Sequence, residues 1–242
     1  MGLCGSDIIA TKVRFPMRRA GSLTVLRAIL DSRLVAVVRA DAPEELLNIV
    51  RSVMSGGLRV VELTMTTPGA LDMLKTACGE LGDEVVLGVG SVLDAETARA
   101  AILSGAQFIV TPILALDVVE TAKRYSRTVI CGAFTPTEVV RAYEGGADMV
   151  KVFPCSLGGP GLIKAIKGPL PHIPLVPTGG VRLDNMREFF LAGAAVLAVG
   201  GNLVKRDFIR ARDWDALTEN VSVFVKEVDR IKKELGLGAD TF

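Results

Sequence analysis

The chain has 242 residues, of which 50% are hydrophobic and 5% aromatic, and its formal net charge is +1. This length suits one large domain, and the balanced charge indicates neither a nucleic-acid groove nor a polybasic membrane patch. The four cysteines lack the spacing of a zinc site and the density of a disulfide scaffold, which favours a reducing compartment. No apolar run reaches the roughly 20 residues that span a bilayer. We therefore expect a cytoplasmic protein without nucleic-acid or membrane partners.

The first segment, residues 1–21, carries several basic residues but no apolar signal-peptide core. We expect an N-terminal extension there and one domain over residues 22–242. Within that domain, residues 22–33 are predicted to form a helix that closes one end of the fold. Residues 213–235 are predicted to form a final amphipathic helix.

Between these helices, short apolar runs rich in Val and Ile recur along the chain, each too short for a helix and typical of strands buried on both faces. The runs span residues 34–40, 59–65, 85–91, 108–113, 128–134, 149–154, 174–180 and 196–201. The segments that separate them have apolar residues at helical spacing and often end in Gly. This alternation predicts an α/β protein with a closed (β/α)8 TIM barrel in a single domain.

Two helix starts are marked by candidate capping boxes, at Asp41–Glu44 and at Thr135–Glu138. In a (β/α)8 barrel, the functional site lies at the carboxyl ends of the strands, so polar residues there carry the most information.

Lys151 stands within the apolar run "MVKVFP". A lysine at a strand end can simply extend its amine to water. Desolvation, however, disfavours an ammonium ion, and a partly neutral amine is the nucleophile that Schiff-base formation with a ketone requires. Glu62 stands in the apolar run "VVELT". The two side chains are compatible with a buried ion pair that serves only the fold, but together they indicate a catalytic lysine and a general acid/base.

Glycine pairs end the seventh and eighth runs, at Gly179-Gly180 and Gly200-Gly201. Barrels commonly bind phosphate at these loops through backbone N–H groups, although each pair is also compatible with a tight turn. His172, the only histidine, precedes the seventh run and is expected to be structural. With one histidine and no carboxylate cluster, the sequence offers little to hold a catalytic metal.

The motifs "VELTMTTPGA", "GVGSVLD", "FIVTP", "TPTE", "VKVFP" and "VPTGGVRLDN" resemble those of the 2-keto-3-deoxy-6-phosphogluconate (KDPG) and 4-hydroxy-2-oxoglutarate (KHG) aldolases. The resemblance implies a homotrimeric TIM-barrel enzyme that cleaves a 2-keto acid to pyruvate and an aldehyde, with a covalent imine on Lys151 and no metal or other cofactor. By the same resemblance, Glu62 shuttles protons and the glycine pairs bind phosphate.

The resemblance also implies a pocket for the pyruvate carboxylate, which we predict to contain Arg39, Ser91 and Thr111. Many family members place an Arg where this chain has Met65, and a Ser where it has Gly201. Arg39 is expected to replace the missing guanidinium. Two other functions remain compatible with the sequence: a sugar-phosphate epimerase that uses the Lys/Glu pair without an imine, and a barrel that binds a metabolite without turnover.

Overall fold

The computed structural model describes residues 21–238, and almost all of the predicted N-terminal extension lies outside these residues. Eight parallel strands form one sheet in the order β7-β6-β5-β4-β3-β2-β1-β8. Isolated parallel bridges, Leu175 with Ala194 and Thr178 with Ala198, connect the two ends of this order and close the barrel. The predicted (β/α)8 TIM barrel is confirmed.

All eight predicted strands are present, each at the place of one apolar run. Their bounds are β1 (Leu34–Val38), β2 (Val60–Thr64), β3 (Val86–Gly90), β4 (Phe108–Val110), β5 (Thr128–Ala133), β6 (Met149–Val152), β7 (Leu175–Pro177) and β8 (Leu197–Val199).

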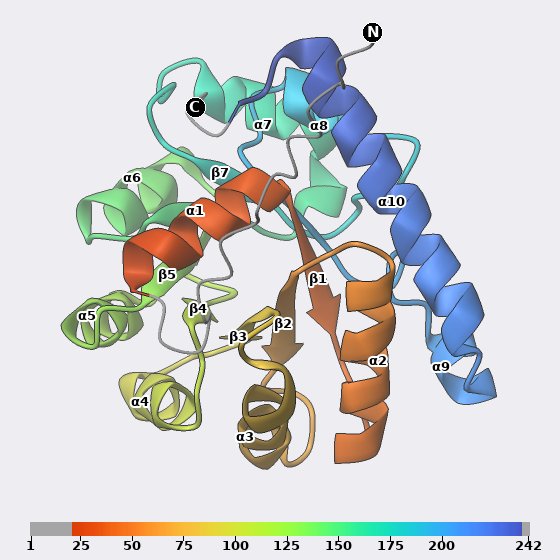
Figure 1. Ribbon diagram of the computed structural model, residues 1–242. Helices are drawn as coiled ribbons and strands as arrows, with labels where there is room; N and C mark the ends of the chain where they lie inside the picture. The colour runs from red at the N-terminus through yellow and green to blue at the C-terminus, as the bar shows by residue number, and fades with distance from the viewer. Residues whose placement is uncertain (1–20, 239–242) are drawn as a thin grey trace, which may run out of the picture.

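Helices follow the strands and form an outer layer around the barrel (Figure 1). They are α2 (Pro43–Ser55), α3 (Ala70–Leu81), α4 (Ala95–Leu103), α5 (Leu116–Arg124), α6 (Pro136–Glu144), α7 (Gly159–Lys167), α8 (Met186–Leu191) and α9 (Arg206–Ala211), with the short 3-10 helix η2 (Cys155–Leu157) before α7.

One of the two predicted capping boxes is present. At the start of α6, the hydroxyl of Thr135 accepts from the N–H of Glu138, whose carboxylate accepts from the N–H of Thr135 at 2.8 Å. The box predicted at Asp41 was wrong, because α2 follows Ala42 with no side-chain cap. The carboxylate of Glu45 accepts from the N–H of Asp41 instead, at 2.6 Å.

Two further helices complete the fold, as predicted. Helix α1 (Ser22–Ser32) crosses one end of the barrel, in red in Figure 1, and inserts Val25 and Ile29 into its interior. Helix α10 (Trp214–Leu235) runs beside α2 along the outside of the barrel. The amino ends of the strands are therefore covered, and the carboxyl ends are left for the site.

The core has two parts because side chains alternate along each strand. One set points outward and packs under the helices, for example Val61 and Val150. The other set fills the lower barrel under α1 and includes Val60, Phe108 and Met149. On each strand, the residue two positions after an inward-facing one also points inward. These residues form the next layer, nearer the carboxyl ends of the strands.

Candidate active site

Lys151 lies on β6, two positions beyond the inward-facing Met149, so its side chain also points into the barrel. It pairs in register with Gly132 on β5 and Val176 on β7, and only 5% of its surface is exposed. The Nζ atom lies 5.1 Å from the centroid of the Phe153 ring. That ring, itself 37% exposed, shields one side of the amine at the barrel mouth.

Glu62 occupies the equivalent layer on β2, two positions beyond the inward-facing Val60, and is 2% exposed. In the strand order, β2 and β6 are four positions apart, so Glu62 and Lys151 face each other from opposite walls of the eight-stranded barrel. The Oε1 atom of Glu62 has no hydrogen-bond partner among residues 21–238. A buried, unpartnered carboxylate oxygen that faces an amine is typical of a group that handles protons rather than one that holds the fold.

Burial raises the pKa of the Glu62 carboxyl above its ordinary value, because desolvation disfavours the charged form. The positive charges of Lys151 and then Arg39 act in the opposite direction, without cancelling the effect of burial. Glu62 is therefore poised to hold a proton more readily than an exposed glutamate and to release it when a positive charge develops nearby.

Two glycines that were not predicted to belong to the site make room for this layer. A Cβ on Gly90 would overlap the carboxylate of Glu62, and a Cβ on Gly132 would overlap the backbone at Pro112. The sequence feature that marks Gly90 is its spacing from Gly88: the two glycines are two positions apart and therefore lie on the same face of β3. Gly88 leaves the same kind of space for the ring of Phe108.

The residues predicted to bind the carboxylate follow β1, β3 and β4 at the carboxyl end of the barrel. Arg39 follows β1 and is exposed, and its charge acts on Glu62. Ser91 follows β3, is partly exposed and has a φ of 61°, a left-handed conformation that few non-glycine residues adopt. Such backbone conformations gather at functional sites, where the surrounding structure holds them.

Thr111 follows β4 and is fully buried. Its hydroxyl donates to the carbonyl of Ile113 at 2.6 Å and accepts from the N–H of Gly132 at 2.8 Å. These bonds hold the loop after β4 against β5, directly beside the strand that carries Lys151. The geometry gives this hydroxyl a positioning role within the protein.

The glycine pairs lie in the loops after β7 and β8. Gly179 and Gly180 have φ values of 84° and 79°, a conformation that favours glycine, and a Cβ on Gly180 would come within 2.8 Å of the Ser156 Cα atom. Around the position of a Cβ on Gly201, in contrast, no atom lies within 4 Å. The loop after β8 is therefore open at this residue.

His172 lies in the loop before β7, at the amino end of the barrel, and its ring packs edge-on against Tyr143 with centroids 5.7 Å apart.

Burial raises the pKa of the Cys155 thiol to about 11, which keeps it protonated. Within residues 21–238, no three His, Cys, Asp or Glu side chains group in a way that could hold a metal ion. No helix in that range is both long and apolar enough to cross a bilayer.

The sequence and the fold are shared with known proteins. The family model described as KDPG and KHG aldolase matches residues 25–220. The 2-dehydro-3-deoxy-phosphogluconate aldolase of Treponema pallidum (strain Nichols) is 35% identical over 198 residues, which cover 81% of this chain and 93% of the relative. The 2-dehydro-3-deoxy-6-phosphogalactonate aldolase of Escherichia coli K12 is 35% identical over 194 residues, which cover 80% of this chain and 93% of the relative.

A solved structure is also similar. The KDPG aldolase of Legionella pneumophila, with pyruvate captured at low pH as a covalent carbinolamine intermediate, superimposes with a TM-score of 0.78 and 25% sequence identity. The match covers 83% of this chain and 97% of that one.

Proposed function

The chain belongs to the KDPG and KHG aldolase family, a class I carbon–carbon lyase family, and we propose that Lys151 is its Schiff-base lysine and Glu62 its proton shuttle. The observation that carries this proposal is the pair itself: a buried amine and a buried carboxylate on opposite walls of the barrel, in the layer above the apolar core.

The reaction begins at the C2 ketone of the substrate. The neutral amine of Lys151 adds to C2 to form a carbinolamine, which takes up a proton from solvent and loses water to give a protonated imine. Glu62, directly or through a water molecule, takes the proton of the C4 hydroxyl. The C3–C4 bond then breaks, its electron pair moves into the imine to form an enamine, and C4 leaves as an aldehyde. Glu62 returns the proton to C3, and water hydrolyses the imine to release pyruvate and Lys151.

The rest of the site binds the two ends of the substrate. Arg39 and Ser91 hold the carboxylate next to C2, since a guanidinium and a hydroxyl both suit a carboxylate. Thr111 keeps the loop beside Lys151 in place through its hydrogen bonds with Ile113 and Gly132. Backbone N–H groups of the Gly179-Gly180 and Gly200-Gly201 loops bind the distal phosphate.

The substrates are 2-keto-3-deoxy-6-phospho sugar acids of the KDPG type, or 4-hydroxy-2-oxoglutarate, with glyceraldehyde 3-phosphate or glyoxylate as the aldehyde product. The KDPG and KHG aldolase family and the relatives described above support both classes. The imine itself accepts the electron pair of the broken bond, so the reaction needs no metal or cofactor. Full activity in the presence of EDTA is the expected result.

The decisive experiment is reduction of the imine. Wild-type protein is incubated with pyruvate and borohydride, its intact mass is measured, and the modified peptide is mapped. We expect one reduced pyruvate adduct on Lys151. Lys151→Met is expected to abolish the adduct, whereas the control Lys164→Met, an exposed lysine of α7, retains it. Folded wild-type protein without an adduct would point to an epimerase or to a binding protein without turnover.

We also propose that the chain works as a homotrimer in the cytoplasm. Support comes from the family and from large apolar side chains that the monomer leaves exposed, among them Leu103 at 66% and Leu157 at 75%. Light scattering on the purified protein measures its molar mass and so tests the homotrimer, which a monomeric mass would contradict.

A further inference from the structure

The loops after β7 and β8 present unused backbone donors side by side. Among residues 21–238, no acceptor is found for the N–H groups of Gly180 and Val181 in one loop or of Gly201 and Asn202 in the other. Amide donors without an internal acceptor suit an anion such as a phosphate. Because these donors belong to two separate loops, they can hold one phosphate only if the loops keep a fixed distance from each other.

Two asparagines fix the first loop and connect it to the second. The Asn185 side chain donates to the carbonyl of Gly180 at 2.9 Å and accepts from the N–H of Arg182 at 2.8 Å. The Asn202 side chain donates to the carbonyl of Val181 at 2.8 Å, a bond that joins the two loops directly.

A third asparagine holds the second loop from behind. Asn220, half-buried on α10, donates to the carbonyl of Asn202 at 3.1 Å and to the carbonyl of Leu203 at 2.7 Å. These carbonyls belong to the same turn as the free N–H groups of Gly201 and Asn202. The orientation of that turn, and so the direction of its donors, depends on α10, which continues to Leu235 beyond the family match that ends at residue 220.

We infer that Asn220 is a positioning residue that sets the preference of the site for phosphorylated substrates, although it lies behind the loop and touches no substrate. The inference rests on the proposed function of the glycine loops. It is strengthened by Gly201, which offers no hydroxyl to a phosphate, so that binding relies on the placement of backbone donors. Preorganised donors lose their advantage when their supporting residues are removed.

The test compares the phosphorylated sugar acid KDPG with the same sugar acid without its phosphate. For Asn220→Ala, we expect KM for KDPG to rise at least 10-fold while kcat stays within about twofold, because the imine chemistry lies elsewhere. The kinetic constants for the unphosphorylated acid should not change. A general loss of stability would lower activity toward both substrates equally, so the split between them identifies the positioning role.

Thr218→Val is the matched control, since Thr218 lies on the same helix but donates to the carbonyl of Ser52 on α2, at 3.3 Å. It should leave the substrate preference unchanged. Asn220→Ser, a smaller polar change at this half-buried position, provides a second variant and should give the same split as Asn220→Ala.

Each outcome decides the inference. If wild type prefers KDPG and the two Asn220 variants keep that preference, the inference is wrong and the proposed phosphate site stands. If wild type forms the pyruvate imine but does not distinguish the two acids, the phosphate site and this inference both fail. If wild type forms no imine, the proposed function itself fails.

Discussion

The carboxylate of Glu62 occupies the space that a side chain on Gly90 would fill, on the neighbouring strand of the barrel. Glu62 therefore lies against a wall with no side chain and remains free to face Lys151. This contact makes Gly90 part of the acid/base apparatus, although glycine contributes no chemical group.

Gly90→Ala tests this relationship without changing a reacting residue. The added methyl group must displace the carboxylate of Glu62, and because general acid/base catalysis typically contributes about 100- to 10,000-fold, we expect kcat/KM for cleavage to fall by roughly 100-fold or more. Lys151 is untouched, so borohydride should still trap pyruvate. Steady-state kinetics and imine trapping on the same preparation measure both effects.

Gly79→Ala is the control for this prediction, because Gly79 lies in α3 and a Cβ there meets nothing within 4 Å. It should retain wild-type kinetics. If Gly90→Ala also retained them, Glu62 could move without consequence and would not be the proton shuttle.

Thr111→Val separates a positioning role from contact with the substrate. The substitution keeps the shape but leaves the N–H of Gly132 without its partner, at a cost of about 1–3 kcal/mol for a buried unsatisfied group. It also removes the bond to the carbonyl of Ile113, which keeps only the weaker contact from the Cys131 thiol. We expect the free energy of unfolding in denaturant to fall by that amount, with Thr111→Ser closer to wild type. An unchanged stability with a 10-fold loss of pyruvate affinity would instead make the hydroxyl a carboxylate ligand.

Gly201→Ser tests the open position in the loop after β8. Nothing lies within 4 Å of the added Cβ, so a serine fits and its hydroxyl can reach a bound phosphate. A typical hydrogen bond contributes roughly 0.5–1.5 kcal/mol net, and we therefore expect KM for KDPG to fall about 3- to 10-fold. The constants for the unphosphorylated acid and those of a Gly79→Ser control should stay the same. A KM for KDPG that does not fall would place the phosphate elsewhere.

The sequence predicted the features that depend on local pattern. All eight strands, α1 and α10 follow from apolar periodicity, and the box at Thr135 follows from residue types at fixed spacing. The box predicted at Asp41 was wrong because the motif constrains residue types only: the carboxylate that reaches back to Asp41 comes from Glu45, one position later than expected.

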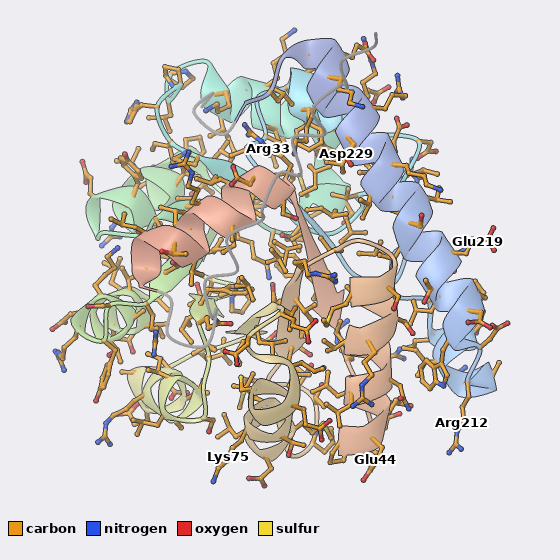
Figure 2. The ribbon with its side chains drawn as sticks, in the orientation of Figure 1. Arg33, Glu44, Lys75, Arg212, Glu219 and Asp229 are labelled. Atoms are coloured by element: carbon orange, nitrogen blue, oxygen red, sulfur yellow. The ribbon has the colours of Figure 1, made fainter. Side chains whose placement is uncertain are left out.

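Features that depend on distant contacts were not predictable. Arg33 is 1% exposed, and its guanidinium donates to the carbonyl of Ala195 at 2.9 Å and to that of Gly238 at 2.5 Å. Figure 2 labels it where α1 meets β1, inside the molecule, whereas Glu44 and Lys75 project outward. No local pattern distinguishes this arginine from exposed ones. The contact of Glu62 with Gly90 and the asparagine bridges were missed for the same reason.

The pH dependence of activity follows from the raised pKa of Glu62. In the cleavage direction Glu62 must accept a proton, so it must begin ionised. Because burial raises its pKa, kcat/KM should fall on the acid side with a midpoint above the ordinary pKa of a glutamate. A midpoint at or below the ordinary value would contradict the assignment of Glu62 as the base.

The free energy of unfolding should also depend on pH because of the raised pKa of Glu62. The folded state binds the Glu62 proton more tightly than the unfolded state, so this contribution to stability is fully present below the ordinary glutamate pKa and is lost as the pH rises through the raised one. Glu62→Gln stays neutral at every pH. Its free energy of unfolding relative to wild type should therefore increase with pH across the window between these two pKa values, and should remain constant below that window. Lys151→Met removes a charge that lowers the pKa of Glu62 in the folded state, so in that background the upper end of the window should move to higher pH. Urea unfolding of wild type, Glu62→Gln, Lys151→Met and the double variant at a series of pH values measures these shifts. A relative stability of Glu62→Gln that decreases with pH would mean that the charge of Lys151 outweighs burial.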